Sequence, residues 1–522
     1  MPYKSRPFDY EPVTRRGKKV RRPGRELDEE FAAPQSRLSE EARADEWITS
    51  AAELPVETDS NLLWPRRTGD AAGQTEAAPA EKKERWILKR GHAISFVGLF
   101  LFTLVVFFRP YDLFAVFVPL KTLAFWIAIT TLVIFIPTQL NIEGRLSLRL
   151  REVNLLLLLA LIGLLGVPFA INRAEAWESF VQFLKIVLMF VVMVNVIRTE
   201  GRLKALIFVA LSSACLVSVG ALRDYRLGQL KMNGERVTGI IGGMFGNPND
   251  MALYLVMMIP LAFSLLLIAR GLTRKIIYGI FILVMIAANL VTFSRGGFFG
   301  LVCVLGVLAW KIGRRHRLSV LVVSLLAGVS LFFLLPSGLV ERFAAMFGLA
   351  SNQSAADSAI SRWELLLRSL GQTVRHPLLG LGMSNFHIVS IHEQVSHNAY
   401  TQVSSEMGII AFILYVMFMI IPLRRLRQIE RETLAARHNS HFYYLSVGLQ
   451  ASLIGYMVSS FFVSVAYLYY LYYPVGFAIC LYLMYQTSQA KEAGARRVGA
   501  ETHGRGDEKI EPGVPAHAVL EC

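Results

Sequence analysis

The sequence contains little charge and little cysteine for its length. Of 522 residues, 18% are Asp, Glu, Lys or Arg, whereas 54% are hydrophobic. That charged share is low for a soluble protein. The four cysteines include no CxxC pair, and three of them lie within apolar segments. Neither a disulfide framework nor a zinc site is therefore indicated.

What the sequence has instead is a series of long apolar blocks almost without charge. Their lengths suit the roughly 30 Å hydrocarbon layer that a spanning helix must cross. In lipid each backbone amide must be satisfied within its own helix. The sequence therefore predicts an all-α polytopic membrane protein of about twelve transmembrane helices. The expected blocks are 93–108, 115–137, 153–170, 178–197, 203–221, 251–269, 276–293, 297–312, 318–335, 400–422, 444–464 and 467–486.

The two ends of the chain differ from this transmembrane domain, which is expected at 86–490. Residues 1–85 are rich in Arg, Glu, Pro and Ala and lack apolar periodicity, so we expect a disordered cytoplasmic extension. No apolar stretch follows a short basic start, so a cleavable signal peptide is not expected. Residues 491–522 are expected to form a disordered cytoplasmic tail.

Basic residues follow every second apolar block. By the positive-inside rule these loops are cytoplasmic, and so are both termini. Topology thus accounts for the formal net charge of +15, and no nucleic-acid partner is expected. The loops between the remaining blocks face outward, and two of them are long.

The first long outer loop, 223–250, is basic where the rule disfavours basic residues. It carries Arg223, Arg226, Lys231 and Arg236. Their retention on the outer side favours an anionic ligand, and the alternative is that they are simply exposed, since a few outer arginines are not rare.

The second long outer loop, 336–398, contains a helical pattern of its own. Apolar residues recur at three- and four-residue spacing from Ile360 through Trp363 to Val374, which is typical of an amphipathic helix. We expect this helix to lie at the membrane interface or to cap the bundle. The sequence HPLLGLG then ends the helix and turns the chain back.

A polar pair, His397 and Asn398, follows that loop at the outer end of the tenth block. Near neutral pH an imidazole can accept a proton from a hydroxyl, which makes His397 a candidate general base. The alternative is that the pair caps the helix beginning near Ala399.

Three cationic residues on the outer half are further candidates. Arg295 lies in TFSRGGFF, where Gly296 and Gly297 are expected to leave space for its guanidinium to hold a phosphate. Arg362 lies on the polar flank of the expected loop helix, and Lys185 lies within the fourth apolar block. Solvation or snorkelling from a helix end is the alternative for all three.

Metal-binding patterns are missing. The chain has no EF-hand loop, HExxH, P-loop or GxGxxG before a helix. Outward-facing acids are sparse, so a carboxylate-bound divalent metal is not favoured and no cofactor is expected. Arginines would have to balance the charge of a bound diphosphate. The outer acids are chiefly Glu341, Asp357, Glu364, Glu393 and Glu406.

From about residue 203 to 485 the sequence resembles the bacterial O-antigen ligase and O-antigen polymerase superfamily of membrane glycosyltransferases. The family pattern is His, then Asn, Ser or Gln, nine residues, and Gly-x-x-Gly/Thr/Tyr. His397, Asn398 and Gly408 match it, and Ala411 departs from it.

Four shorter elements are also similar to those of the family. A family arginine-x3-leucine pattern is not met at Arg295, because Phe299 stands at that spacing. The similar elements are GNPN at 246–249, SRGG at 294–297, SRW at 361–363 and HPLLGLG at 376–382.

The resemblance implies metal-independent transfer of a glycan from a polyprenyl diphosphate carrier, such as undecaprenyl diphosphate, to an acceptor hydroxyl. The reaction would occur at the outer leaflet of the bacterial inner membrane and serve lipopolysaccharide or polysaccharide biosynthesis for the cell envelope. His397 would act as the base. The residues that would bind the donor are Arg295, Arg362, Asn398, Arg223, Arg236 and Lys185.

Several alternatives stay open. A polymerase of the same superfamily would join repeat units instead of moving a finished glycan to lipid A–core, and a protein O-glycan ligase would use protein hydroxyls. The acceptor is thus a glycolipid, a glycan or a protein. A transporter of lipid-linked glycans would carry ionisable residues near the bilayer midplane or two related halves with broken helices, and neither pattern is seen.

Overall fold

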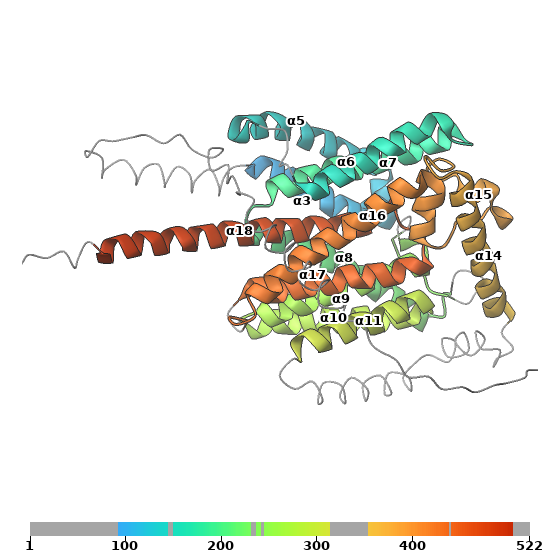
Figure 1. The fold of residues 1–522 in the computed structure, drawn as a ribbon. Coiled ribbons are helices and arrows are strands. Elements are labelled where there is room, and N and C mark those ends of the chain that lie inside the picture. Colours follow the sequence, from blue (N-terminus) through green and yellow to red (C-terminus); the bar gives the residue numbers. More distant parts are fainter. Residues whose placement is uncertain are drawn as a thin grey trace, which may run out of the picture. The chain divides into compact units, whose positions relative to one another are not determined.

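The computed structural model describes residues 92–144, 150–230, 236–241, 245–313, 353–437 and 440–504. This part of the chain is built from helices, with no strand of a sheet among the described elements (Figure 1). The expected N-terminal extension and the apolar block at 318–335 lie outside the described residues. The all-α prediction is confirmed for the part that the structure describes.

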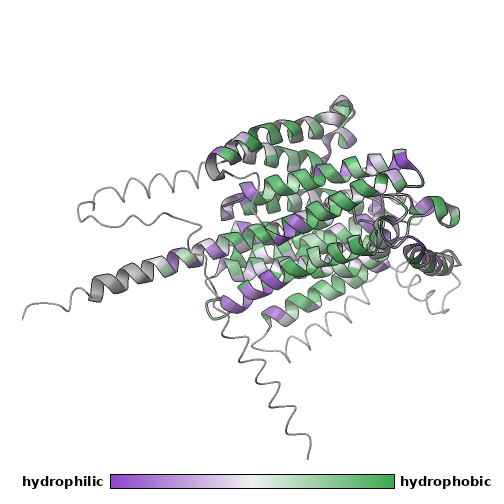
Figure 2. Cartoon of the chain, turned by 45° about the horizontal axis from the view of Figure 1, so that its top comes forward, coloured by the Kyte–Doolittle hydropathy of each residue, from purple (hydrophilic) through white to green (hydrophobic). Residues whose placement is uncertain are grey.

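Ten of the described helical segments are long and apolar enough to cross a membrane, and they coincide with ten of the twelve expected blocks. Figure 2 shows hydrophobic residues along these helices and hydrophilic residues gathered toward their ends. The helices are α3 (Ala93–Phe108, continued by α4, Pro110–Leu113), α5 (Leu123–Glu143), α6 (Arg151–Gly166), α7 (Arg173–Val196), α8 (Glu200–Arg226), α9 (Pro248–Ile268), α10 (Leu272–Val291), α11 (Arg295–Ile312), α16 (Ala399–Glu432) and α17 (His441–Ser459).

The last expected block forms α18 (Tyr469–Gly504), which differs in character from the ten. Its first turns are rich in tyrosine, and Tyr470, Tyr472 and Tyr473 are buried in the core. The helix continues to Gly504, so the disordered tail expected from residue 491 is wrong at its start. An apolar pattern ends where lipid ends, whereas a helix can continue into water.

The same difference appears at the end of α16. Arg424, Arg425, Arg427 and Arg431 were expected in a loop after the tenth block, but α16 continues through them to Glu432. Arg425 Nε lies 2.9 Å from the buried carboxylate of Glu152 on α6. The basic end of the helix is therefore packed against the bundle.

Helix α9 lies at the centre of the bundle. Its most apolar stretch is 78% buried, against 17% for α5 and 22% for α10, and it packs on α8, α10, α11 and α17. Beyond Asp250 in its first turn the helix carries no charged residue, and apolar side chains occupy most of its surface, which suits a helix surrounded by other helices. The exposed apolar faces of α5 and α10 instead suit contact with lipid.

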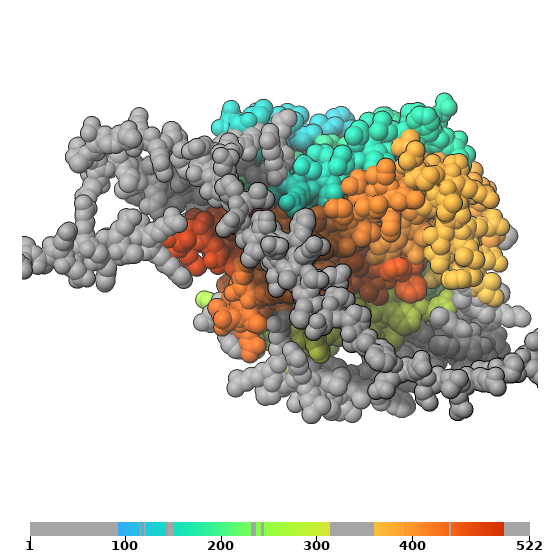
Figure 3. All heavy atoms as spheres, in the orientation of Figure 1, coloured from blue at the N-terminus to red at the C-terminus, as the bar shows by residue number. Residues whose placement is uncertain are grey.

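At one end of the bundle, helix α14 (Gln353–Arg375) runs across the ends of the other helices, followed by the short α15 (Phe386–Val389) (Figures 1 and 3). We call this the α14 end. Leu365 is buried in a cluster with Leu381 and Phe386 of the following segment, and Thr373 Oγ1 lies 2.9 Å from Ser404 Oγ on α16. The amphipathic helix expected in the outer loop is confirmed.

The apolar stripe of α14 is largely exposed. Trp363 is 61% exposed and Val374 is 78% exposed, and Ile360, Leu367 and Leu370 are exposed as well. A helix that capped the bundle through its apolar stripe would bury these side chains. The orientation therefore favours the expected position at the membrane interface, where amphipathic helices bury one apolar face.

Helix α16 is broken at Gly408, and the HPLLGLG segment crosses it there. Gly408 has φ 87° and ψ 175° within an otherwise helical segment. Its neighbour Ile409 donates its backbone N–H to the carbonyl oxygen of Pro377 at 2.8 Å. Gly382 donates in turn to the carbonyl oxygen of Glu406 at 3.0 Å. The crossing segment thus satisfies backbone groups that the break leaves without helical partners.

Two glycines make this crossing possible. A Cβ on Gly408 would lie 2.3 Å from the carbonyl oxygen of Leu378, and a Cβ on Gly380 would lie 2.3 Å from the backbone of Glu406. Both residues also have positive φ, which disfavours any other L-residue. The buried carboxylate of Glu406 then accepts backbone N–H groups from Ser384 at 3.0 Å and Phe386 at 3.3 Å.

Substitution Gly408→Ala is expected to destabilise the protein, because it adds about 1–3 kcal/mol of backbone strain and a clash with Leu378. Thermal unfolding in detergent should show a midpoint several degrees below that of the wild type. The matched control is Gly371→Ala on α14, where a Cβ meets nothing within 4 Å. An unchanged midpoint for Gly408→Ala would contradict the crossing as described.

Candidate functional site

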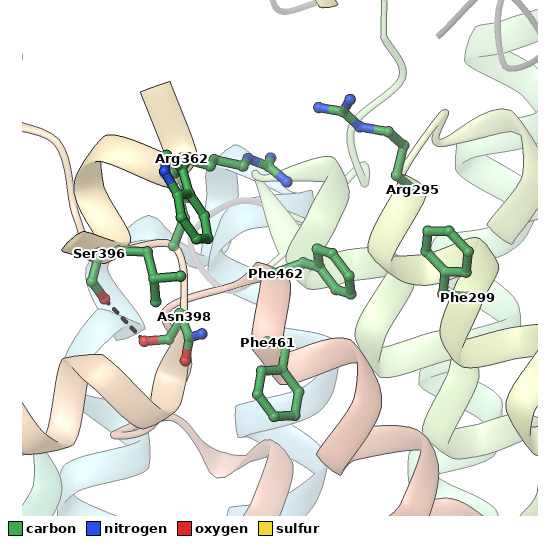
Figure 4. A pocket seen from close by; sticks show the side chains of 10 residues that line it. Arg295, Phe299, Arg362, Ser396, Asn398, Phe461 and Phe462 are labelled. Carbon is green, nitrogen blue, oxygen red and sulfur yellow. Dashed lines mark hydrogen bonds between the residues drawn. The ribbon is translucent and has the colours of Figure 1, made fainter. Parts of the chain in front are cut away.

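A cavity of about 220 Å³ lies at the α14 end (Figure 4). Its polar lining comes from α11, α14 and the turn before α16, which are far apart in the sequence. Its apolar lining comes from α11, α14 and η6 (Ser460–Phe462), the 3-10 turn that ends α17. The lining residues are Arg295, Phe299, Arg362, Trp363, Leu366, Ser396, His397, Asn398, Phe461 and Phe462.

His397 stands in the turn immediately before α16. It has φ 51°, an uncommon conformation for a residue other than glycine. Asn398 is the N-cap of α16, and its Oδ1 accepts the backbone N–H groups of Tyr400 at 2.9 Å and Thr401 at 3.2 Å. The capping interpretation is thus right for Asn398, whereas the His397 side chain lines the cavity.

Ser396 holds this turn from the other side. Its Oγ donates to the carbonyl oxygen of Asn398 at 3.0 Å, as drawn in Figure 4, and lies 3.0 Å from Ser464 Oγ in the loop after η6. Surrounding hydrogen bonds of this kind keep a residue in an unfavourable conformation. The direction of the His397 side chain is therefore set by its neighbours.

The environment of His397 lowers the pKa of its imidazole from 6.5 to about 4. The larger cause is burial of the ring, which disfavours the charged form, and the smaller is the positive charge of Arg362. At neutral pH the ring is therefore uncharged and keeps the lone pair that can accept a proton.

Arg295 is the first residue of α11 and follows a tightly bonded corner. Ser294 caps the helix by accepting the N–H of Gly297 at 3.3 Å, and it donates its hydroxyl to Asn249 Oδ1 at 2.9 Å. Arg236 donates to the same Asn249 oxygen at 2.9 Å and to the carbonyl oxygen of Thr292 at 3.1 Å. The GNPN and SRGG elements thus form one network that fixes the helix start carrying Arg295.

The glycines beside Arg295 have a role that differs from the expected one. They were expected to leave its surroundings open. A Cβ on Gly296 would instead lie 2.7 Å from Phe462 Cβ, and one on Gly297 would lie 2.5 Å from Ala252 Cβ. The expectation is wrong because neighbouring side chains fill this space, and the glycines allow α11 to pack closely on α9 and η6.

Figure 4 shows the Arg295 and Arg362 side chains reaching toward one another from opposite sides of the cavity. Below them lie Phe299, Phe461 and Phe462. The cavity thus combines two guanidinium groups and an uncharged imidazole with an aromatic wall. Such a lining suits a ligand that has an anionic group beside an apolar part.

The other expected donor-binding residues do not line this cavity. Arg223 is exposed near the end of α8. Lys185 lies midway along α7, where it donates to Gln182 Oε1 at 3.1 Å and stands 5.5 Å from the ring centroid of Phe125. Two N–H groups of Arg236 are bound by the protein, as described above. Ligand contacts of these three residues stay predictions, as does a contact of the Asn398 amide.

Several lining residues were not identified from the sequence. Phe461 and Phe462 lay within an expected apolar helix, and only the turn of η6 brings them to the cavity. Phe299 lay within another expected apolar block, 297–312, and nothing in the sequence distinguished it from its neighbours. Ser396 directly precedes the polar pair of His397 and Asn398. That position is the one sequence signal that could have placed it among the candidate site residues. Among the described residues, no group of three or more His, Cys, Asp or Glu side chains is placed to hold a metal ion.

Residues 280–416 match the family model described as O-antigen ligase. The matched segment runs from α10 into α16 and contains Arg295, Arg362, His397 and Asn398. This segment of the chain is thus similar to the O-antigen ligase family. The match covers about a quarter of the chain, 137 of 522 residues. A search of curated proteins gave no match.

The fold gives a physical meaning to the histidine pattern of the O-antigen ligase superfamily in this chain. His397 lines the cavity, Asn398 caps α16, and Gly408 is the point at which HPLLGLG crosses that helix. Ala411, the position that departs from the pattern, is fully buried in the core beyond the crossing. The small side chain of Ala411 therefore affects core packing. Its difference from the family pattern does not change the cavity lining.

Chemical modification by diethyl pyrocarbonate, which attacks the uncharged imidazole, can test the environment of His397. The modification rate of His397, read by peptide mass spectrometry, should stay near its maximum down to about pH 5 and fall with a midpoint near 4. Arg362→Gln removes one of the two causes of the lowered pKa, so the midpoint should rise while staying below 6.5. A wild-type midpoint near 6.5 would contradict the buried, cationic environment.

Proposed function

We propose that this protein transfers a glycan from a polyprenyl diphosphate carrier to an acceptor hydroxyl, without a metal ion, at the outer leaflet of the inner membrane. The observation that supports this proposal most strongly is the meeting of Arg295, Arg362 and His397 in one cavity with an aromatic wall. The match of residues 280–416 to the O-antigen ligase model supports a lipid-linked glycan as the donor. The proposal assigns a role to each part of the cavity.

The two arginines bind the diphosphate. A guanidinium group forms paired hydrogen bonds to phosphate oxygens, and bonds to ionised partners are stronger than neutral ones. When the bond between the sugar and the diphosphate breaks, negative charge grows on the leaving oxygen. Arg295 and Arg362, which extend over the cavity from opposite sides, stabilise that charge in the way that Mg²⁺ does in other transferases.

His397 acts as the general base. The acceptor oxygen attacks the anomeric carbon, its proton moves to the imidazole, and the bond from that carbon to the diphosphate oxygen breaks. An imidazole with a pKa of about 4 is uncharged but weakly basic. A diphosphate beside Arg362 offsets the charge that lowers this pKa, so donor binding makes His397 a stronger base.

The aromatic wall receives the first isoprene units of the carrier. Phe299, Phe461 and Trp363 are 42%, 55% and 61% exposed, so the wall is open on its apolar side. Trp363 belongs to the apolar stripe that places α14 at the interface. The cavity is therefore at the depth where a lipid diphosphate has its head group.

The arrangement of the basic residues supports an outward-facing site. The arginine-rich end of α16 lies at the opposite end of that helix from His397. By the positive-inside rule that end is cytoplasmic, and the α14 end faces the periplasm.

A transfer assay with purified protein tests the proposal. It uses a polyprenyl-diphosphate-linked glycan and, in separate reactions, lipid A–core, a growing glycan or a hydroxyl-bearing protein as acceptor. His397→Gln should reduce the rate about 10²- to 10⁴-fold, the usual contribution of a general base. His376→Gln, a change at an exposed histidine outside the cavity, should leave the rate unchanged.

Wild-type transfer by His397→Gln would contradict the assignment of the base. Absence of transfer to every acceptor by a wild-type protein that binds the donor would contradict the proposed reaction. The acceptor that supports transfer distinguishes the ligase, the polymerase and the protein O-glycan ligase.

A further inference from the structure

A second cavity of about 220 Å³ lies at the end of the bundle opposite the α14 end, where α9 ends and α10 begins. Helix α9 has 21 residues and begins beside the Asn249–Ser294 corner. At 1.5 Å per residue it spans about 30 Å, the thickness of the hydrocarbon layer. The second cavity is thus at the depth of the other membrane interface. Its lining is Lys204, Leu265, Ile268, Ala269, Arg270, Arg274, Tyr278 and His441.

The lining of this cavity is cationic. Arg270 and Arg274 are exposed at the α9–α10 turn, and Lys204 approaches from α8. Glu200 lies 2.6 Å from Lys204 Nζ and 3.2 Å from His441 Nδ1 through the same carboxylate oxygen. The cavity therefore has three permanent positive charges, those of Lys204, Arg270 and Arg274, and one carboxylate, that of Glu200. Its net charge is positive, which favours an anion.

Apolar side chains line the cavity beside these basic residues. Leu265, Ile268 and Ala269 are at the end of α9, and Tyr278 is on α10. A small soluble anion would contact only the basic residues, whereas a lipid would contact both the basic residues and this apolar lining.

We propose that this cavity binds an anionic phospholipid of the cytoplasmic leaflet. Arg270, Arg274 and Lys204 hold the phosphate of the head group, and the acyl chains begin against the apolar lining of Leu265, Ile268 and Tyr278. Basic pockets between transmembrane helices on the cytoplasmic side have the charge and depth that such head groups require. The proposal concerns the membrane end that takes no part in glycan transfer, and it holds whatever reaction the first cavity performs.

Native mass spectrometry of the full-length protein, released from detergent with added lipid, tests this proposal. The wild type should retain phosphatidylglycerol in preference to phosphatidylcholine. A basic residue near an anionic lipid surface contributes about a fivefold change in binding, so Arg270→Gln with Arg274→Gln should weaken phosphatidylglycerol retention about thirtyfold. Both arginines are exposed, so we expect the double variant to fold, which its unfolding midpoint without lipid checks.

The matched control is Arg424→Gln with Arg427→Gln, which removes the same charge from two exposed arginines at the same end of the bundle. It should bind phosphatidylglycerol as the wild type does. Equal loss in both double variants would show a general effect of surface charge and overturn the proposal. Unchanged binding in Arg270→Gln with Arg274→Gln would also overturn it.

Inorganic phosphate separates a lipid from a soluble anion. Phosphate at millimolar concentration should not displace phosphatidylglycerol, because it lacks the contacts with the apolar lining. Displacement of the lipid by phosphate alone would assign the cavity to a soluble anion and overturn the lipid assignment. A charge reversal, Arg274→Glu, provides a second variant and should abolish the preference for phosphatidylglycerol.

Discussion

The crossing of α16 by the HPLLGLG segment is the constraint on which the rest of the candidate site depends. The segment follows α14, which carries Arg362, and it passes α16 at Gly408, eleven residues after His397. Because neither Gly380 nor Gly408 has a side chain, the two backbones approach closely enough to exchange hydrogen bonds. The position of α14 relative to the turn at His397 is thereby fixed, and with it the placement of Arg362 and His397 in one cavity.

The opposite side of the cavity, facing Arg362, is held by a second rigid part of the structure. Arg236, Asn249 and Ser294 bring the starts of α9 and α11 together, and Arg295 extends from this part toward Arg362. A ligand contact of Arg236 stays a prediction, and the bonds that the structure shows position Asn249 and the Thr292 backbone beside Arg295. The charge of Arg362 acts on His397 in the resting protein, so the groups proposed to bind the donor and to take the proton are electrostatically coupled before any ligand arrives.

Much of the fold follows from the sequence, because lipid imposes a simple rule on apolar blocks. The ten described spans and the amphipathic helix from Ile360 to Val374 were predictable from length and periodicity. The course of the chain beyond the lipid layer was not predictable in this way. There α16 and α18 continue into water, where helices no longer need apolar residues. At the site, Arg295, Arg362 and His397 were identified by type and side of the membrane. The packing role of Gly296 and Gly297, and the turn that brings Phe461 and Phe462 to the cavity, depend on tertiary contacts that no local pattern contains.

The most direct test of the central claim, that one cavity binds a lipid diphosphate through both arginines, measures binding in the absence of chemistry. The ligand is a polyprenyl diphosphate without sugar, and its dissociation constant is measured for the wild type, Arg295→Gln, Arg362→Gln and Arg368→Gln. Loss of a hydrogen bond to a charged group costs about 1.5–3 kcal/mol, so each of the first two variants should bind roughly 10- to 100-fold more weakly. Arg368 is exposed on the same helix as Arg362 but outside the cavity, and its variant should bind as the wild type does. Wild-type affinity in Arg295→Gln and Arg362→Gln, or equal weakening in Arg368→Gln, would contradict the account.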